Sequence, residues 1–389
     1  MKIIRPITIT TAMLPDGAGG SNVPETVDAY AAGTTYYEGN QVRLDSSHTI
    51  YEALPQTTRE IITLDVAPSI PWLPGQTITG QTSLATCVIV QYITSLTYYV
   101  KDRSGAFTLG EIVGVTGIAA LLADQGAAKP TFSSAPNVGH DPAVDVALDT
   151  PLWWKEVSAT NRWKAFDNKV GSQTSQATSI TYCITPGEVF DSIAFLNLDA
   201  ISVRVVLTDP VEGVVYDVTT DLQTTIITGA GTVIDWYSYF FSSIFRKTDI
   251  ALFDIPPYLN AVVDITITYT AGTAKVGAVV LGLQSTIGAT RWNPTIGIHD
   301  YSIKQADEYG VYSISERAFS KRISCAIEIE YASIPDVVNL LALYRSALIV
   351  WVGIDDFSPM IVYGYYKDFS VVIPHLVYAE CSLEIEGLT

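Results

Sequence analysis

Three stretches that lie far apart in the chain place an apolar residue at every second position, and this period limits the possible folds most. The stretches are residues 203–207, 263–269 and 323–329. A period of two puts the apolar side chains on one face of a β-strand. The clearest helical pattern covers residues 334–348, where apolar residues recur at helical spacing. The sequence therefore predicts a mainly β fold with one clear helix in its last quarter.

The length and composition predict several folded domains. A chain of 389 residues exceeds what one ordinary hydrophobic core serves, so we expect about two to four domains. Charged residues make up only 16% of the chain, which indicates a surface that is polar but uncharged, or partly hidden in an assembly. The net charge of −18 repels phosphate backbones, so we expect no direct nucleic-acid contact.

The four cysteines and four histidines are scattered and form no C-x-x-C or other metal-ligand spacing. We therefore expect buried free thiols, no metal site and no cofactor. The first residues, MKIIRPITIT, lack the unbroken apolar core of a signal peptide. No window approaches 18 uninterrupted apolar residues, so we expect no membrane span, and synthesis in a reducing cytoplasm.

Glycine- and proline-rich connectors divide the chain into five expected parts. These are an N-terminal strand with a small carbohydrate-binding-like module (1–60), a small β-module (61–120), a linker (121–150), a central jelly-roll sandwich (151–290) and a C-terminal α+β domain (291–389).

The first module, YAAGTTYYEGNQVRLDSSHTIYEAL (residues 30–54), resembles a small module of chitin-binding-type domains and of many bacteriophage tail proteins. The resemblance implies that exposed tyrosines stack on sugar rings, which makes Tyr36 and Tyr37 candidate ligand-binding residues. The alternative is that these tyrosines form the core of a module too small to have another. Residues 71–117, with GQTITG and SGAFTLGE phrases, resemble a β-module common in phage structural proteins.

The stretch WWKEVSATNRWKAFDNKVGSQT (residues 153–174) and the strands after it resemble a galactose-binding-like (discoidin-like) jelly roll. Members of that fold bind sugars through loops at one end of the sandwich. The resemblance implies candidate contacts to a glycan or a partner, namely Trp153, Trp154, Asn161, Trp236 and Tyr237. We expect Trp153 and Trp154 at the surface.

Three neighbouring residues fit structural roles better. Trp163 and Phe166 lead into the first strand of the jelly roll and are expected in its core. Asp167 precedes a turn, where a carboxylate more often accepts a backbone hydrogen bond than binds a metal ion.

The C-terminal part predicts a hairpin over residues 310–331, then the helix, then three strands that end in CSLEIEGL. This order resembles the barrel-plus-helix domain of distal tail and baseplate-hub proteins. The resemblance implies a β-barrel-like domain with one helix that contacts other subunits.

The chain contains no G-x-S-x-G, H-E-x-x-H or phosphate-loop motif, and we expect no enzyme activity. The leading hypothesis is a structural component of a bacteriophage tail or baseplate, located in the virion tail. Its expected partners are other tail proteins and further copies of itself. The alternative is a receptor-binding tail module that recognises a host surface glycan, and a polysaccharide-degrading enzyme ranks third.

Overall fold

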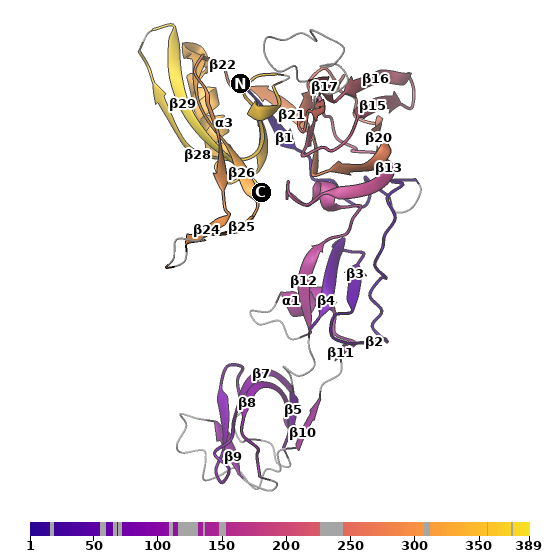
Figure 1. The fold of residues 1–389 in the computed structure, drawn as a ribbon, viewed down its shortest axis with the longest axis vertical. Helices are drawn as coiled ribbons and strands as arrows, with labels where there is room; N and C mark the ends of the chain where they lie inside the picture. The colour runs from indigo at the N-terminus through magenta and orange to yellow at the C-terminus, as the bar shows by residue number, and fades with distance from the viewer. Residues whose placement is uncertain are drawn as a thin grey trace. The chain divides into compact units, whose positions relative to one another are not determined.

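β-Strands separated by most of the chain pair side by side in this protein, as a computed structural model shows (Figure 1). The structure describes residues 1–15, 19–54, 60–64, 68, 72–108, 112–115, 131–134, 137–147, 153–225, 244–306, 308, 312–355, 357–374 and 376–389. The chain divides into two compact units. Unit 1 comprises Met1–Glu25 and Asn161–Thr389, and unit 2 comprises Thr26–Thr160.

A large antiparallel sheet forms the body of unit 1. Within the described residues its order is β19-β14-β21-β1-β27-β28-β29-β26-β22, and β23 also pairs with β26. These strands are β1 (Lys2–Pro6), β14 (Ser192–Leu196), β19 (Ile250–Leu252), β21 (Ala278–Thr286), β22 (Ala289–Thr290), β23 (Thr295–Asp300), β26 (Phe319–Glu330), β27 (Ile349–Val352), β28 (Ile361–Val372) and β29 (Tyr378–Gly387).

Strand β1 links the two halves of this sheet. Ile4 lies opposite Gln284 of β21 on one side and opposite Val350 of β27 on the other. Both Ile3 and Ile4 are buried, because each face of β1 contributes to a different apolar cluster. The first strand of the chain is therefore an interior strand of the sheet.

A second antiparallel sheet in unit 1 has the order β13-β20-β15-β16 (Figure 1). Its strands are β13 (Thr174–Ile184), β15 (Ser202–Asp209), β16 (Gly213–Asp221) and β20 (Val262–Val276). Buried and more exposed residues alternate along β15, as the period of two predicts. Strand β14 and residues 278–282 of β21 are buried on both faces.

The helix α3 (Ile334–Leu343) packs on the large sheet near β26–β29. Pro335 stands in its first turn, where a missing N–H costs nothing. Val337, Leu341 and Tyr344 form its buried stripe against the apolar face of β26 and β29. The shorter elements of unit 1 are η2 (Lys164–Phe166), β17 (Gln223–Thr225), β18 (Ile244–Arg246), β24 (Ile303–Ala306), β25 (Tyr312–Ser315), η3 (Tyr331–Ser333) and η4 (Ser358–Met360).

The described residues of unit 2 form two apolar clusters. One lies on the sheet β10-β5-β8-β7-β6-β9, and the other lies under the sheet β12-β4-β3 beside the pair β11-β2. The elements are β2 (Thr35–Tyr36), β3 (Gln41–Leu44), β4 (Thr49–Ala53), β5 (Glu60–Thr63), β6 (Thr77–Gly80), β7 (Thr86–Thr94), β8 (Thr97–Ser104), β9 (Val113–Val115), β10 (Thr131–Ser134), β11 (Asn137–Val138), α1 (Pro142–Val146) and β12 (Trp154–Ala159).

The mainly β fold class is confirmed. Several groupings differ from the expected parts. Strand β1 pairs inside unit 1 rather than with the first small module, and β12 pairs with β4 of that module, although residues 154–159 were expected to belong to the central domain. The described part of the expected linker holds β10, β11 and α1.

The hairpin expected over residues 310–331 was wrong. Strand β25 pairs with β24, whereas β26 pairs with β29, β22 and β23. The local pattern identifies each strand but not its neighbour.

Candidate functional site

The two adjacent tryptophans expected at the surface lie instead in the core of unit 2. Trp153 and Trp154 are almost fully buried, so the expectation of surface contacts was wrong. The buried carboxylate of Asp145, on α1, explains their position: its Oδ2 accepts hydrogen bonds from the backbone N–H of Trp153 at 2.8 Å and of Trp154 at 2.9 Å. The indole Nε1 of Trp154 donates to the carbonyl of His140 at 2.8 Å.

The two candidate tyrosines point in different directions. Tyr36 is buried, lies 5.1 Å from Trp154 between ring centroids, and its hydroxyl accepts a hydrogen bond from Ala31 N–H at 2.8 Å. Tyr37 is 62% exposed. The alternative reading of Tyr36 as a core residue is therefore confirmed, and Tyr37 alone of this pair presents its ring to solvent.

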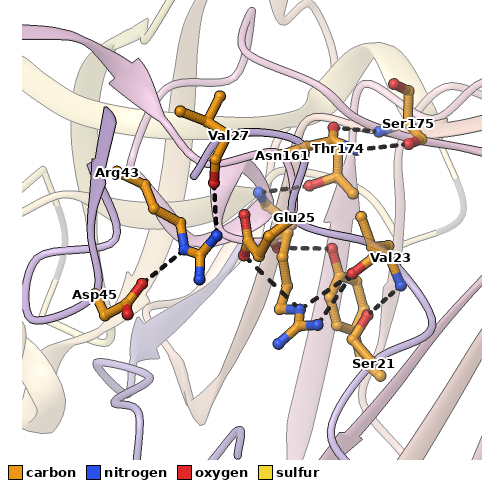
Figure 2. A network of polar contacts seen from close by, with 12 residues as sticks. Ser21, Val23, Glu25, Val27, Arg43, Asp45, Asn161, Thr174 and Ser175 are labelled. Atoms are coloured by element: carbon orange, nitrogen blue, oxygen red, sulfur yellow. Dashed lines mark hydrogen bonds and ion pairs between the residues drawn. The ribbon is translucent and has the colours of Figure 1, made fainter. Parts of the chain in front are cut away.

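The side-chain amide of Asn161 forms hydrogen bonds with the backbone of unit 1. Its Nδ2 donates to Ser175 O at 2.8 Å, and its Oδ1 accepts from Ser175 N–H at 3.0 Å (Figure 2). This pair of bonds mimics a strand partner at the start of β13. Both polar atoms of the amide take part in these hydrogen bonds. Asn161 therefore has a structural role here, although the resemblance implied a ligand contact.

Arg162, the next residue, is a buried cation that ties a distant segment to unit 1. Its guanidinium donates to Val23 O at 3.2 and 3.1 Å, and Glu25 lies 4.0 Å away (Figure 2). The hydroxyl of Tyr182 donates to Arg162 O at 3.1 Å. Arg162 therefore links residues 23–25 to Tyr182 of β13 within unit 1.

The other residues of this stretch have the structural roles that the sequence predicts. Trp163 is buried and contacts Phe166, which in turn packs against Tyr182. Asp167 Oδ1 accepts a hydrogen bond from Lys169 N–H at 2.9 Å. Trp236 and Tyr237, the remaining candidates, lie outside the described residues.

Several exposed apolar side chains of unit 1 lie in a segment that we call the β-arm (residues 292–306 and 312–319). Trp292 is 97% exposed at the turn between β22 and β23, where Asn293 has a positive φ of 77°. Every residue of β23 is exposed, although the strand carries apolar side chains. The exposed large apolar residues of the β-arm are Trp292, Ile296, Ile298, Tyr301, Tyr312, Ile314 and Phe319.

The strands β24 and β25 form a two-stranded ribbon that extends beyond the end of β26, away from α3 (Figure 1). Tyr312 and Ile314 are 71% and 67% exposed. An isolated two-stranded ribbon is marginally stable in water. The apolar residues of β25 therefore lack the cover that stabilises such strands in a larger sheet.

Charged residues hold the base of the β-arm to the large sheet. His299 stacks on Tyr301 with ring centroids 4.5 Å apart, and both reach the buried carboxylate of Glu386 on β29. Lys367 Nζ lies 2.9 Å from the other Glu386 oxygen, and this ion pair lowers the pKa of Glu386. Lys304 of β24 bonds to Asp300 at the end of β23 and holds the pKa of that carboxyl below its usual value.

A cavity of about 260 Å³ opens at the base of the β-arm. Its lining is mainly apolar and includes Leu196, Phe319, Lys321, Ile361, Tyr363 and Leu388.

Two charged residues in the cavity wall, Asp249 and Lys321, form an ion pair with each other. Asp249 is buried and receives hydrogen bonds from Thr248 Oγ1 at 2.6 Å and Ser358 Oγ at 3.1 Å, and it pairs with Lys321. The cavity wall is therefore mainly apolar, with the paired Asp249 and Lys321 among its polar residues.

Neither the β-arm nor this cavity is predicted from the sequence. The WNP turn at residues 292–294 and the uncharged stretch YSIS at residues 312–315 were the available signals. A period of two indicates an apolar face, but it does not say whether the rest of the chain covers that face.

Among the described residues, no group of three or more His, Cys, Asp or Glu side chains could hold a metal ion. No helix in the described part of the chain has the length and apolar character needed to cross a bilayer. Comparisons with protein-family models, curated proteins and solved structures found no match to this chain.

Proposed function

We propose that this protein is a structural subunit of a bacteriophage tail or baseplate, present in several copies and in contact with other tail proteins. The observation that carries the proposal is the row of exposed apolar side chains on the β-arm. Contiguous exposed apolar surface is costly for a monomer and is typical of a binding surface.

The residue types of the β-arm fit a protein partner. Tryptophan and tyrosine dominate the energetics of protein interfaces, and the β-arm presents Trp292, Tyr301 and Tyr312. Only 16% of the chain is charged, which lowers the cost of removing its surface from water in an assembly. The resemblance of several β-modules to phage structural proteins supports the tail as the setting.

The glycan-binding alternative has less support. Trp153, Trp154 and Tyr36 form a packed core, so they cannot provide an aromatic platform without unfolding part of unit 2. Among the described aromatic candidates, Tyr37 is the exposed one.

The proposal is tested by locating a tagged copy of the full chain in phage particles by negative-stain imaging with a gold label. We expect the label on the tail. The double variant Tyr312→Ser/Ile314→Ser should be incorporated less than wild type. Val211→Ser is the matched control, because Val211 is 92% exposed at the turn between β15 and β16. Particles whose tails carry no label would contradict the proposal.

A further inference from the structure

We infer that a groove beside Trp292 binds a neutral sugar, with the indole as a stacking platform and Arg291 and Glu328 as hydrogen-bonding groups. The groove has a volume of about 470 Å³ and is formed by β22, by the turn after it and by β26. Its lining residues are Ala289, Thr290, Arg291, Trp292, Ala326 and Glu328. The inference goes beyond the proposed function, because it assigns a glycan ligand in addition to the protein partners.

An irregularity in strand pairing turns Trp292 out of the sheet. Strands β22 and β23 both pair with β26, and the chain advances five positions from Thr290 to Thr295 while their partners on β26 lie three positions apart. The two extra residues bulge from the sheet edge, and Asn293 takes a positive φ of 77°. Bulges at sheet edges re-aim side chains. The sequence between β22 and β23 therefore presents the indole to solvent.

The first argument is the exposure of this indole. Trp292 is 97% exposed, whereas the other five tryptophans in the described part of the chain are at most 5% exposed. An indole in water is costly unless a ligand covers it. A pyranose ring has a face of C–H groups, and an aromatic face packs well against such groups. Trp292 at the wall of a groove is therefore suited to stack on one sugar ring.

The second argument is the supply of donors and acceptors. Arg291 pairs with Glu380, and its guanidinium lies 4.0 Å from Glu328. All three side chains keep 39–46% of their surface exposed, so a ligand can reach them. A sugar hydroxyl both donates and accepts, so neighbouring hydroxyls can bond to the guanidinium and to a carboxylate together. An apolar segment in the groove would remove these charges from water without replacing their hydrogen bonds.

The third argument is the room that small side chains leave. Ala289 and Ala326 line the groove beside Trp292. A cavity of about 150 Å³ holds a benzene ring, so a groove of about 470 Å³ has room for a pyranose ring with its hydroxyls. The strand at its wall is held in place, because Thr290 Oγ1 donates to Gly353 O at 2.6 Å. The groove therefore does not depend on a mobile side chain to open.

The charge of the site selects neutral sugars. Arg291 faces two carboxylates, Glu328 and Glu380, so the cluster keeps one negative charge. The whole chain carries a net charge of −18. Both charges repel uronic acids, sialic acids and phosphorylated sugars. The expected ligand is therefore a neutral hexose or an N-acetylhexosamine.

The sugar site is separate from the ribbon β24–β25. Trp292 precedes β23, and the ribbon follows the other end of that strand. The six residues of β23 span about 20 Å at about 3.3 Å per residue. A change at Trp292 can therefore be tested without disturbing Tyr312 and Ile314.

A glycan array probed with the purified full chain tests the inference. The array carries oligosaccharides of neutral hexoses, of N-acetylhexosamines and of uronic acids, and the neutral oligosaccharide that binds best is then titrated by calorimetry. We expect binding to at least one neutral oligosaccharide and none to uronic acids. Trp292→Ala should raise the Kd about tenfold, because stacking on the ring is lost. Trp292→Phe should raise it less, because a smaller aromatic face remains.

A second variant tests the groove without touching the indole. Ala289→Gln places a longer, uncharged side chain in the groove and should also weaken binding, whereas Ala289→Ser leaves the groove open and should bind as wild type. Tyr37→Ala removes an exposed aromatic ring from unit 2 and should have no effect. Tyr312→Ser/Ile314→Ser should bind sugar as wild type does. Unchanged thermal unfolding midpoints will show that each variant is folded.

Three results would overturn the inference. They are no binding to any neutral oligosaccharide at millimolar concentration, a preference for uronic acids, and equal sugar affinity in wild type, Trp292→Ala and Ala289→Gln. If Trp292→Ala lowers incorporation into tails and no sugar binds, Trp292 is a protein contact and the proposed function stands without this ligand. Sugar binding by a chain that is absent from the tail would instead keep this inference and reject the proposed function.

Discussion

The imidazole of His140 lies flat against the indole of Trp153, with ring centroids 3.7 Å apart and ring planes 8° apart. Tyr99 of β8 meets the same indole edge-on at 5.1 Å. Trp153 thus joins side chains of the sheet that contains β8 to the cluster under β12 and β4 within unit 2.

Replacing Trp153 should therefore destabilise unit 2 rather than abolish a surface contact. For Trp153→Ala we expect the free energy of unfolding to fall by about 3–5 kcal/mol, as for other large core truncations. Urea unfolding followed by circular dichroism measures this. Tyr37→Ala is the control and should change stability little, because Tyr37 is largely exposed. Equal stabilities for the two variants would show that Trp153 is not a core residue.

The carboxylate of Asp145 should matter as an acceptor of hydrogen bonds from buried donors. Asp145→Ala leaves the N–H groups of Trp153 and Trp154 without this partner. We expect a loss of about 1–3 kcal/mol in the free energy of unfolding for a buried donor left unpaired. Glu156→Ala, at an exposed position of β12, serves as the control in the same denaturation experiment. If both substitutions have the same small effect, the two hydrogen bonds do not support the tryptophan pair.

The buried guanidinium of Arg162 should stabilise the docking of residues 21–25 on the rest of unit 1. Arg162→Met keeps most of the side-chain length but removes the hydrogen bonds to Val23 O, so we expect a loss of about 1.5–3 kcal/mol. Arg204→Met, which breaks an exposed ion pair with Asp217, should have little effect. Hydrogen exchange of the amides near Val23 should accelerate in Arg162→Met alone. Unchanged exchange there would contradict the role we assign to Arg162.

The buried thiols should make stability fall at alkaline pH. Burial raises the pKa of Cys87 from an ordinary value of 9.0 to about 12. Between these two values the unfolded chain releases the proton that the folded chain keeps, so the contribution of Cys87 is full below pH 9.0 and is lost as the pH rises toward 12.

Cys87→Ala isolates this contribution from the tyrosines that also titrate. The stability difference between wild type and Cys87→Ala, measured by urea unfolding in reductant, should be larger near about pH 8 than near about pH 10. A difference that stays constant across this interval would show that Cys87 ionises equally in both states. In the folded protein at about pH 8, the thiol should also react slowly with alkylating reagents, because the thiolate is the nucleophile.

The sequence predicted the strands and the helix of unit 1 well, because their patterns are local. The alternation in residues 203–207 and 323–329 reappears as the burial pattern of β15 and β26. The apolar stripe of α3 lies against the sheet as its spacing predicts. Each of these features depends on side chains within a few residues of one another.

What the sequence could not predict depends on pairing between distant residues. Trp153 and Trp154 looked like surface residues because the buried acceptor that fixes them, Asp145, lies in a segment read as a linker. Strand β25 looked like the partner of β26 because the two are adjacent, yet β29 and β23 occupy both edges of β26. Period and composition identify an apolar face, and only the tertiary fold determines what meets it.

The interior position of β1 sets an order of events while the chain is being made. Its two neighbours, β21 and β27, are synthesised more than 270 residues later, so Ile3 and Ile4 leave the ribosome without their partners. Residues 26–160 have their internal partners as soon as residue 160 is made. Unit 2 can therefore fold during synthesis. In unit 1, β1 cannot pair with its neighbours in the large sheet until most of the chain has been synthesised.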